Sequence, residues 1–408
     1  MTLKILHTSD WHIGQLLHGE ERFAEQRHML DQITQLVMHE QPDLMLLAGD
    51  IYDVAVPNTK ALRMLSDALM DIHRACPEMT IVAISGNHDS AVRHEVNQQV
   101  WQALGVHMIG SMHNTDIHQH IIPILSRDNT LLAYVAAVPY AAQRMISDDF
   151  YQRLHEQIAQ MGAEAHVPIL FVGHLAASTC QSTGHSVDTY SNDTIYIGNI
   201  ETMDIHQLGT AYDYIALGHI HKAQNLTDRA RYCGSPIAMS FDEVARDYRH
   251  GVTIVEIDAL GIPPHIREED ILPLYPLVNI PAEGFANEQE VLDELARFPE
   301  DIPARIRLKV LLANNEILSY NHKQQVRERL RNKQATYCET HVQRLEDTTT
   351  TPKTSQAVRM QLSELQHMQP IDVAKQWMQL HNEEMTPELE QLFIYALQQA
   401  QESDCHED

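Results

Sequence analysis

The chain has 408 residues, and its 56 acidic against 29 basic side chains give a formal net charge of −27 with histidine taken as neutral. This length suits two or three domains, and 44% hydrophobic with 21% charged residues excludes wholesale disorder. The longest apolar stretch, residues 131–142, is far shorter than the roughly 20 residues of a membrane helix, so we expect no membrane span.

The first residues and the cysteines indicate the compartment. Met1 leads directly into an apolar run without a basic segment or cleavage site, so we expect a cytoplasmic protein. Five cysteines without a CxxC pair predict free thiols rather than disulfides or a thiolate zinc site. The acidic balance opposes polyphosphate ligands, so a nucleic-acid activity would require metal ions, a local basic patch or a basic partner.

Apolar runs alternate with helical periodicity over residues 1–110, which predicts a layered α/β domain. Leu62, Leu65, Leu69 and Ile72 recur at helical spacing, and we expect them to face a sheet. Buried strands are predicted at residues 3–9, 44–48, 80–85, 169–172, 214–217 and 252–257. Several of these runs end in glycine, which permits the sharp turn found where open α/β sheets place their sites.

Prolines between residues 263 and 281 interrupt this pattern and predict the end of the first domain. A strand near 306–312, a helix at 317–333 and a strand at 341–345 then predict a small β-α-β unit. Residues 348–354 read as a linker, and two amphipathic helices follow. We therefore expect domains at 1–262 and 263–346, with a linker and helices at 347–408.

Five short motifs carry carboxylate, amide and imidazole groups, and most of them follow an apolar run. Taken alone, each is weak, because a lone Gly-His is more often a capped turn than a ligand. Together they place such groups repeatedly at strand ends, which favours a shared site. The motifs are Asp10-Trp11-His12, Gly49-Asp50-Ile51-Tyr52-Asp53, Gly86-Asn87-His88-Asp89, Gly173-His174 and Gly218-His219-Ile220-His221.

These oxygen and nitrogen groups suit manganese, iron or zinc better than a calcium cage or a thiolate site. Their number exceeds the needs of one ion and fits two. Paired ions share a bridging ligand, for which Asp50 is our candidate, and they activate a water for attack on phosphorus. His88 follows the ligand Asn87 and is the candidate acid for the leaving alkoxide, since imidazole titrates near neutral pH.

In their order and spacing, the motifs resemble the calcineurin-like metallophosphoesterase superfamily. Residues 7–14, 196–198, 216–221 and 231–236 look like its bacterial DNA nuclease members. The resemblance implies a four-layer αββα sandwich, a small α/β capping domain and a C-terminal helical pair. It also implies a manganese-dependent DNA exonuclease and endonuclease that cleaves ends and hairpins in DNA repair, recombination and replication.

The resemblance further implies a role for each motif residue. One ion would be held by Asp10, His12, Asp50 and His221. The other would be held by Asp50, Asn87, His174 and His219. His88 would be the catalytic histidine. Two aspartates stay open: Asp53, a histidine in some relatives, orients a site residue or caps a turn, and Asp89 supports His88 or caps a helix.

Basic charge is concentrated at residues 305–333, which carry eight basic against two acidic side chains, a net charge of +6. This segment is either a solvated helix face or a surface that contacts phosphates. The resemblance, in which a capping domain holds the duplex, favours DNA contact. The candidates are Arg305, Arg307, Lys309, Lys323, Arg327, Arg329, Arg331 and Lys333.

The C-terminal helices carry an apolar stripe of Trp377, Leu380, Leu392 and Phe393, which must dock on the body or on a partner. The resemblance favours a partner, an SbcC-type coiled-coil ATPase, within a heterotetramer built on a homodimer of this chain. Two rival functions remain: an enzyme of the same fold that acts on phosphomonoesters or cyclic nucleotides, and a noncatalytic scaffold.

Overall fold

The computed structural model describes residues 2–142, 145–177, 202–244, 248–314 and 316–345, and the fold below concerns these residues. Residues up to Leu345 form one compact unit. Within the described ranges, no helix combines the length and apolar character that crossing a membrane requires. The C-terminal helices and their four partner-binding candidates lie outside the described residues.

A six-stranded sheet is built first from β1 (Leu3–Thr8), in the order β16-β15-β1-β4-β5-β6. The strands β1, β4, β5 and β6 are parallel, and β15 and β16 join them antiparallel. The helices α1 and α2 pack through apolar side chains on the outer face. The bounds are β4 (Leu44–Ala48), β5 (Thr80–Ile84), β6 (Val106–Ile109), β15 (Gly251–Ile257), β16 (His265–Asp270), α1 (Phe23–Glu40) and α2 (Thr59–Ala75).

A second six-stranded sheet has the order β13-β14-β12-β9-β8-β7. Its strands β8, β9, β12 and β14 are parallel, and the edge strands are antiparallel. The helix α5 (Phe150–Ala165) covers its outer face. The strands are β7 (Ile121–Leu125), β8 (Leu131–Val138), β9 (Ile169–His174), β12 (Tyr214–Gly218), β13 (Gln224–Asn225) and β14 (Ala230–Tyr232).

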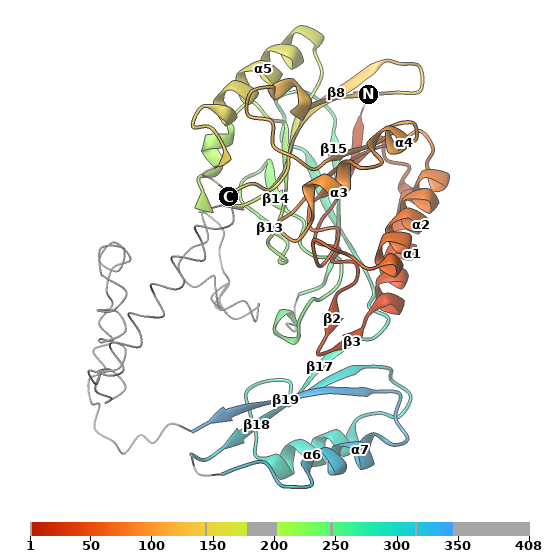
Figure 1. Ribbon diagram of the computed structural model, residues 1–408, viewed down its shortest axis with the longest axis vertical. Helices are drawn as coiled ribbons and strands as arrows, with labels where there is room; N and C mark the ends of the chain where they lie inside the picture. The colour runs from red at the N-terminus through yellow and green to blue at the C-terminus, as the bar shows by residue number, and fades with distance from the viewer. Residues whose placement is uncertain (1, 143–144, 178–201, 245–247, 315, 346–408) are drawn as a thin grey trace, which may run out of the picture. The chain divides into compact units, whose positions relative to one another are not determined.

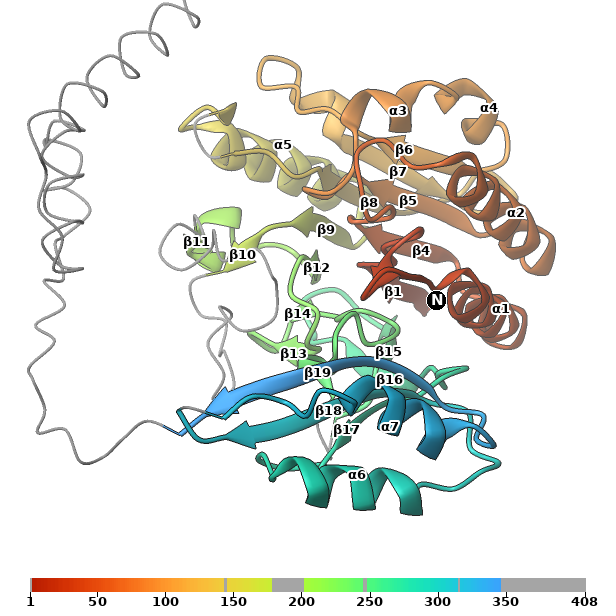
Figure 2. The same ribbon diagram turned by 60° about the horizontal axis from the view of Figure 1, so that its bottom comes forward.

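The two sheets pack face to face around a central apolar core that includes Leu46 and Val82 from one sheet and Val172 and Ala216 from the other. Figure 2 shows α1 and α2 on one side of the strands and α5 on the other. Helix, sheet, sheet and helix therefore follow one another, and the predicted four-layer αββα class is confirmed. The strands predicted at 44–48, 80–85 and 214–217 correspond to β4, β5 and β12.

One expected sheet-facing residue is misplaced. Helix α2 begins at Thr59, after the Asn58 side chain accepts a hydrogen bond from the Ala61 amide (2.9 Å). Leu65, Leu69 and Ile72 are buried against the sheet, as predicted. Leu62, however, is 37% exposed, because Ala61 takes the inward position in the first turn. The prediction for Leu62 was wrong.

A three-stranded parallel sheet in the order β17-β18-β19 follows the two large sheets (Figure 1). The predicted β-α-β unit is present, with a shorter helix and a longer last strand. The helix starts late because the Ser319 amide donates to Glu288 of α6 (2.9 Å) rather than within a helical turn. The elements are β17 (Leu277–Ile280), α6 (Glu288–Arg297), β18 (Arg305–Leu312), α7 (His322–Leu330) and β19 (Thr336–Arg344).

The predicted domain limits stay predictions, with one observation that bears on the first of them. Strand β16 pairs with β15, so the first large sheet continues past residue 262. That limit falls inside a hairpin, because the prolines at 263 and 264 occupy its turn rather than an exit from the domain. The core between β18, α6 and α7 is separate from the cores of the two large sheets.

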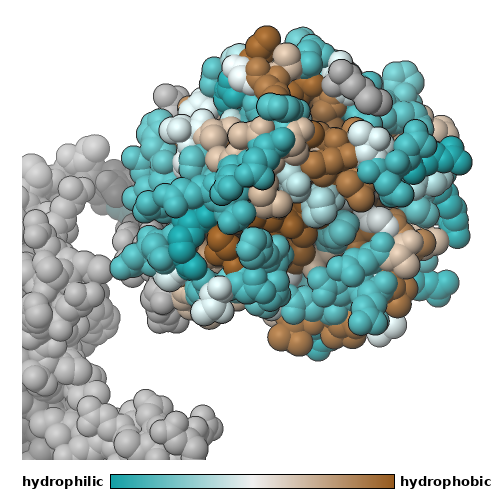
Figure 3. Space-filling model, turned by 90° about the horizontal axis from the view of Figure 1, so that it is seen from above, coloured by the Kyte–Doolittle hydropathy of each residue, from teal (hydrophilic) through white to brown (hydrophobic). Residues whose placement is uncertain are grey.

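Short elements complete the described chain, and some leave apolar side chains at the surface. Val92, Val96 and Val100, around α3 and α4, are 63–71% exposed. Figure 3 shows hydrophobic residues gathered between hydrophilic ones on the face that it draws. The short elements are β2 (Leu16–Leu17), β3 (Glu20–Glu21), α3 (Ala91–Glu95), α4 (Gln98–Gln102), β10 (Ala176–Ala177), β11 (Thr202–Met203), and the 3-10 turns η1 (Ile117–His120), η5 (Ile205–Leu208) and η6 (Phe241–Glu243).

Candidate metal centre

The predicted site residues all lie at or just after the carboxyl ends of strands. β1, β4 and β5 supply them from the first large sheet, and β9 and β12 supply them from the second. Because the two sheets pack face to face, these strand ends meet at one place. The residues brought together are Asp10, His12, Asp50, Asn87, His88, His174, His219 and His221.

The backbone at this place has unusual conformations. Asp10, His12, Asp50 and His219 have φ values of 53°, 44°, 48° and 94°, in the left-handed region that non-glycine residues rarely adopt. Gly49 also has a positive φ of 88°, and a Cβ on it would collide with the His174 ring. Such strained conformations cluster at functional sites, where the surrounding fold holds them in place.

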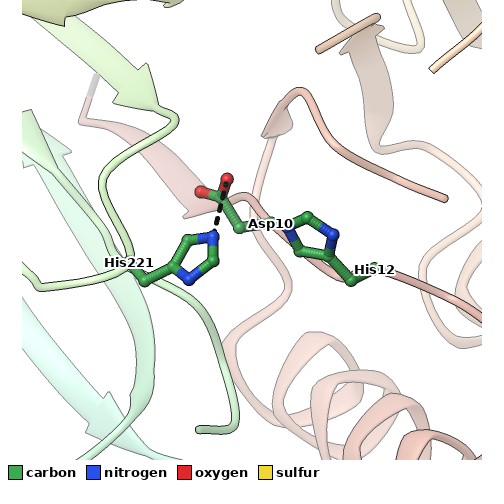
Figure 4. Close-up of side chains that lie close together, drawn as sticks. All are labelled: Asp10, His12 and His221. Carbon is green, nitrogen blue, oxygen red and sulfur yellow. Dashed lines mark ion pairs between the residues drawn. The ribbon is translucent and has the colours of Figure 1, made fainter. Parts of the chain in front are cut away.

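The first candidate ion site is formed by Asp10, His12 and His221, which Figure 4 shows converging from separate segments. Their possible ligand atoms all lie within 4.8 Å of one another. Nε2 of His221 lies 3.8 Å from Oδ1 of Asp10. Both ring nitrogens of His12 are buried without a hydrogen-bond partner, as expected of a side chain that binds a cation.

The second candidate site is formed by Asp50, His174 and His219, with Asn87 beside them. Oδ1 of Asn87 lies 3.0 Å from Nε2 of His174 and 2.9 Å from Nδ1 of His219. Oδ2 of Asp50 lies 3.3 Å from Nε2 of His174 and 3.7 Å from Nε2 of His12 in the first site. The Asp50 carboxylate is thus shared between both groups.

The hydrogen bond of His174 fixes which nitrogen faces the site. Its Nδ1 donates to the carbonyl of Ala48 (2.8 Å), so Nε2 is the atom directed at Asp50 and Asn87. A neutral ring with this tautomer presents a lone pair to two oxygen acceptors. A divalent cation between them would relieve this repulsion, so the donor set fits a metal ion.

Electrostatics inside the cluster are strong. Although burial favours the neutral imidazole, the Asp50 carboxylate raises the pKa of His174 to about 9. Burial alone would raise the pKa of Asp50, but His174 and His12 hold it well below its usual range. Burial and neighbouring His174 lower the pKa of His219 to about 3. Asp50 is therefore a carboxylate, the form that binds a cation.

The comparisons with known proteins point to one family. A family model described as calcineurin-like phosphoesterase matches residues 3–223, a range that contains all eight clustered residues. The chain belongs to the calcineurin-like phosphoesterase family. A member of this metallophosphoesterase family is expected to bind divalent metal ions, and the two side-chain groups above provide candidate sites for them.

Relatives of this phosphoesterase share one name, that of the SbcD protein of the SbcCD nuclease. The protein from Rhodobacter capsulatus is 34% identical over 318 residues, which cover 72% of this chain and 76% of the relative. The one from Escherichia coli K12 is 29% identical over 288 residues, 64% of this chain and 68% of the relative. The one from Bacillus subtilis is 32% identical over 265 residues, 62% and 66% of the two chains.

His88 lies beside the two candidate sites of the phosphoesterase. His12, Asp50 and His88 form a third group with close ligand atoms, and the His88 ring packs edge-on against His12 at 4.8 Å between centroids. The His88 amide donates to Oδ1 of Asp50 (2.9 Å), while Nδ1 contacts the carbonyl oxygen of Asp53 (2.8 Å). With Nδ1 engaged in this way, Nε2 is the nitrogen free to act.

The two aspartates left open by the sequence have different positions. Oδ1 of Asp53 lies 3.3 Å from Nδ1 of His12, so its carboxylate faces a candidate ligand. Asp89 instead accepts hydrogen bonds from the amides of Ile51 (3.0 Å), Tyr52 (2.8 Å) and Gly86 (2.9 Å). Asp89 is therefore neither a helix cap nor a partner of the His88 ring; it ties two site loops together.

Two further residues at the site escaped the sequence analysis as functional candidates. Oε1 of Glu243 lies 3.0 Å from Nδ1 of His221. Against the effect of burial, Glu243 raises the pKa of His221 to about 9. The ring of Tyr140 stacks near His219, with centroids 6.4 Å apart. The run Ser240-Phe241-Asp242-Glu243 was visible in the sequence, but no spacing rule connects it to His221.

Three of the eight candidate DNA contacts need correction. Arg305, Arg307 and Lys309 point to the same side of β18 and are only 9%, 6% and 9% exposed. Arg305 pairs with Glu25 (2.6 Å) and Arg307 with Asp242 (2.6 Å), so carboxylates of the chain itself already neutralise them. Burial, together with the ion pairs of the two arginines, removes all three from the candidate DNA surface.

The other five candidates lie on or after α7, which packs on the opposite face of β18. Lys333 donates to two backbone carbonyls of the chain, and Arg329 donates to the carbonyl of Gln325. Lys323, Arg327 and Arg331 are exposed. These three stay predictions as DNA contacts.

Proposed function

We propose that this phosphoesterase is a DNA nuclease that hydrolyses phosphodiester bonds with two Mn²⁺ ions, as a double-strand exonuclease and a single-strand endonuclease. The observation that carries the proposal is the shared Asp50 carboxylate, since a bridging ligand is what distinguishes a two-metal centre from two separate sites. The name of the relatives, which contains the word nuclease, supports DNA as the substrate.

The residues would divide between two ions around Asp50. One ion would be held by Asp10, His12, Asp50 and His221. The other would be held by Asp50, Asn87, His174 and His219. When bound, two divalent ions supply Lewis-acid chemistry, activating a water and neutralising charge on the phosphoryl oxygens.

His88 would act on the leaving group. The water oxygen forms the new bond to phosphorus, and the bond from phosphorus to the leaving oxygen breaks. Because Nδ1 of His88 is engaged with the Asp53 carbonyl, the proton for that leaving oxygen would come from Nε2. Asp53 supports this chemistry twice, through its carbonyl toward His88 and through its carboxylate toward His12.

We also propose that the chain works with an SbcC-type coiled-coil ATPase in DNA repair and recombination in the cytoplasm. The support is the name of the relatives, which denotes one component of a complex. Trp377, Leu380, Leu392 and Phe393 are the proposed contacts to the ATPase, and a homodimer of this chain would form the centre of a heterotetramer.

A paired substrate assay tests the nuclease proposal. An end-labelled duplex, a DNA hairpin and a chromogenic phosphomonoester are each incubated with the full chain, after EDTA treatment and after Mn²⁺ is restored. We expect Mn²⁺-dependent cleavage of both DNA substrates, and the same assay is run with the partner ATPase added. Cleavage of the phosphomonoester with intact DNA in both settings would overturn the proposal and favour a phosphomonoesterase.

A further inference from the structure

The 3-10 turn η6 (Phe241–Glu243) stands between the small sheet and the candidate metal centre. Phe241 is buried in a small apolar cluster with Leu17 from β2 and Leu277 from β17. The two acidic residues that follow it point to different partners. Consecutive side chains of one short turn thus contact a sheet of one part and a candidate metal ligand of another.

Toward the small sheet, η6 is held by polar contacts from two strands. Nη2 of Arg307 on β18 lies 2.6 Å from Oδ1 of Asp242, and its guanidinium lies over the Phe241 ring. Asn279 on β17 donates to the carbonyl of Phe241 (3.1 Å) and accepts from Nε of Arg307 (2.8 Å). Arg307 is only 6% exposed, so this ion pair is poorly screened by water.

Toward the metal centre, η6 presents Glu243. Its Oε1 lies 3.0 Å from Nδ1 of His221, and its Oε2 accepts the amide of Met239 (2.8 Å). With both oxygens engaged, the carboxylate has one orientation, and it directs Nε2 of His221 toward Asp10. A carboxylate that fixes the ring of a metal-binding histidine in this way typically contributes a factor of about 10 to 100 to metal affinity.

We propose that Glu243 is a positioning residue for His221, and that η6 transmits the placement of the small sheet to this one ligand. The inference rests on the proposed two-metal centre, because it assigns His221 to the ion held with Asp10 and His12. It predicts that the small sheet controls occupancy of that ion and leaves the ion held by His174 and His219 unaffected.

The test is Mn²⁺ binding to the metal-free full chain, measured by calorimetry and by the magnetic coupling of paired ions in electron paramagnetic resonance. Glu243→Gln keeps the size of the side chain, and Arg307→Met cuts the link from the small sheet. Each is expected to weaken one of two Mn²⁺ ions about 10- to 100-fold, to leave the other unchanged, and to reduce the signal of coupled pairs.

Arg305→Met is the matched control. Arg305 lies on the same face of the same strand and also docks the small sheet, but it does so on Glu25 of α1 (2.6 Å) and not on η6. Its variant is expected to bind both ions like the parent chain. Equal losses in Arg305→Met and Arg307→Met would overturn the transmission through η6. Should Arg307→Met fail to fold, Asp242→Asn cuts the same link at a side chain that is 37% exposed.

The remaining outcomes separate this inference from the proposed function. If the parent chain binds two coupled ions and Glu243→Gln binds them equally well, Glu243 does not position His221 and the inference fails alone. If the parent chain binds no ion pair, the two-metal proposal fails and the inference fails with it.

Discussion

Oδ1 of Asp53 lies 3.3 Å from Nδ1 of His12, in a protein where both nitrogens of that buried ring lack a hydrogen-bond partner. The pair has the arrangement of a carboxylate that orients a metal-binding imidazole. The backbone carbonyl of the same aspartate contacts His88. A change of the side chain alone therefore affects His12 and preserves the contact to His88.

Asp53→Asn is expected to lower Mn²⁺ affinity about 10- to 100-fold, because an amide orients the His12 ring less strongly than a carboxylate. Calorimetry on the metal-free chain measures this. Asp67→Asn, at a side chain that is 56% exposed on α2, is the control and should bind Mn²⁺ like the parent. Unchanged affinity in Asp53→Asn would leave Asp53 as a loop residue only.

His88→Gln is expected to lower kcat for DNA cleavage by about 10² to 10⁴, because the leaving oxygen loses its proton donor. Mn²⁺ binding should stay close to that of the parent, since the His88 amide still donates to Asp50. His39→Gln, at a side chain that is 82% exposed, serves as the control. An unchanged rate in His88→Gln would argue against its role as acid.

Asp89→Asn is expected to destabilise the metal-free chain by about 2–3 kcal/mol, because one amide group cannot accept the three backbone hydrogen bonds that the carboxylate accepts. Denaturant unfolding measures the change. Asp128→Asn, in an exposed turn, should stay within about 0.5 kcal/mol of the parent. A similarly small effect of Asp89→Asn would mean that the two loops do not depend on this carboxylate.

The stability of the chain should fall in acid through His7, which lies between the two large sheets with Nδ1 2.8 Å from the Tyr214 hydroxyl. Burial and the nearby Arg231 lower its pKa to about 3 from an ordinary 6.5. The unfolded chain therefore binds the extra proton between these values. His7 supports folding above pH 6.5 and loses that support as the pH falls toward 3.

His7→Asn removes this titration. Relative to the parent, the free energy of unfolding of the variant is expected to improve by about 2 kcal/mol between about pH 7 and about pH 5. Denaturant unfolding at both pH values gives the comparison, with His39→Asn as an exposed control that should show no such change. A difference between variant and parent that stays constant across this range would contradict the neutral state of His7.

The exposed basic residues on and after α7 can be tested by salt dependence. Replacing Lys323, Arg327 and Arg331 by glutamine should reduce the slope of log K against log salt for duplex DNA by about 2 to 3, if each contacts one phosphate. Fluorescence anisotropy across a salt series measures the slope.

The control for this variant carries the same change in charge elsewhere. Arg63, Arg74 and Arg127 have side chains that are 83%, 67% and 78% exposed, and their replacement by glutamine should leave the slope unchanged. Equal slopes in both triple variants would place the DNA on another surface.

The large-scale fold and the composition of the site could be predicted from the sequence, and the reason is local. Asp10, Asp50 and His174 each sit at or beside the end of an apolar strand, and strand ends of a layered α/β domain meet at one edge. Alternation in β18 likewise predicted a core of Ile306 and Leu308. Such patterns are written within a few consecutive residues.

Features that depend on distant parts of the chain could not be predicted. Glu243 reaches His221 across 22 positions of sequence, and Arg305 reaches Glu25 across 280. A basic residue on the outer face of a strand looks exposed until another part of the chain docks on it. The exposure of Leu62 failed for a smaller reason of the same kind, because the helix start at Asn58 set which residue of the first turn faced inward.

The left-handed backbone at Asp10, His12, Asp50 and His219 has a consequence for how this centre could be rebuilt. Side chains of the right type, grafted at the right separations onto ordinary turns, would point in other directions. The fold arranges these donors before any cation arrives, so its folding energy and its affinity for metal draw on the same contorted loops. A designer who wanted the chemistry would have to transplant the loops along with the side chains.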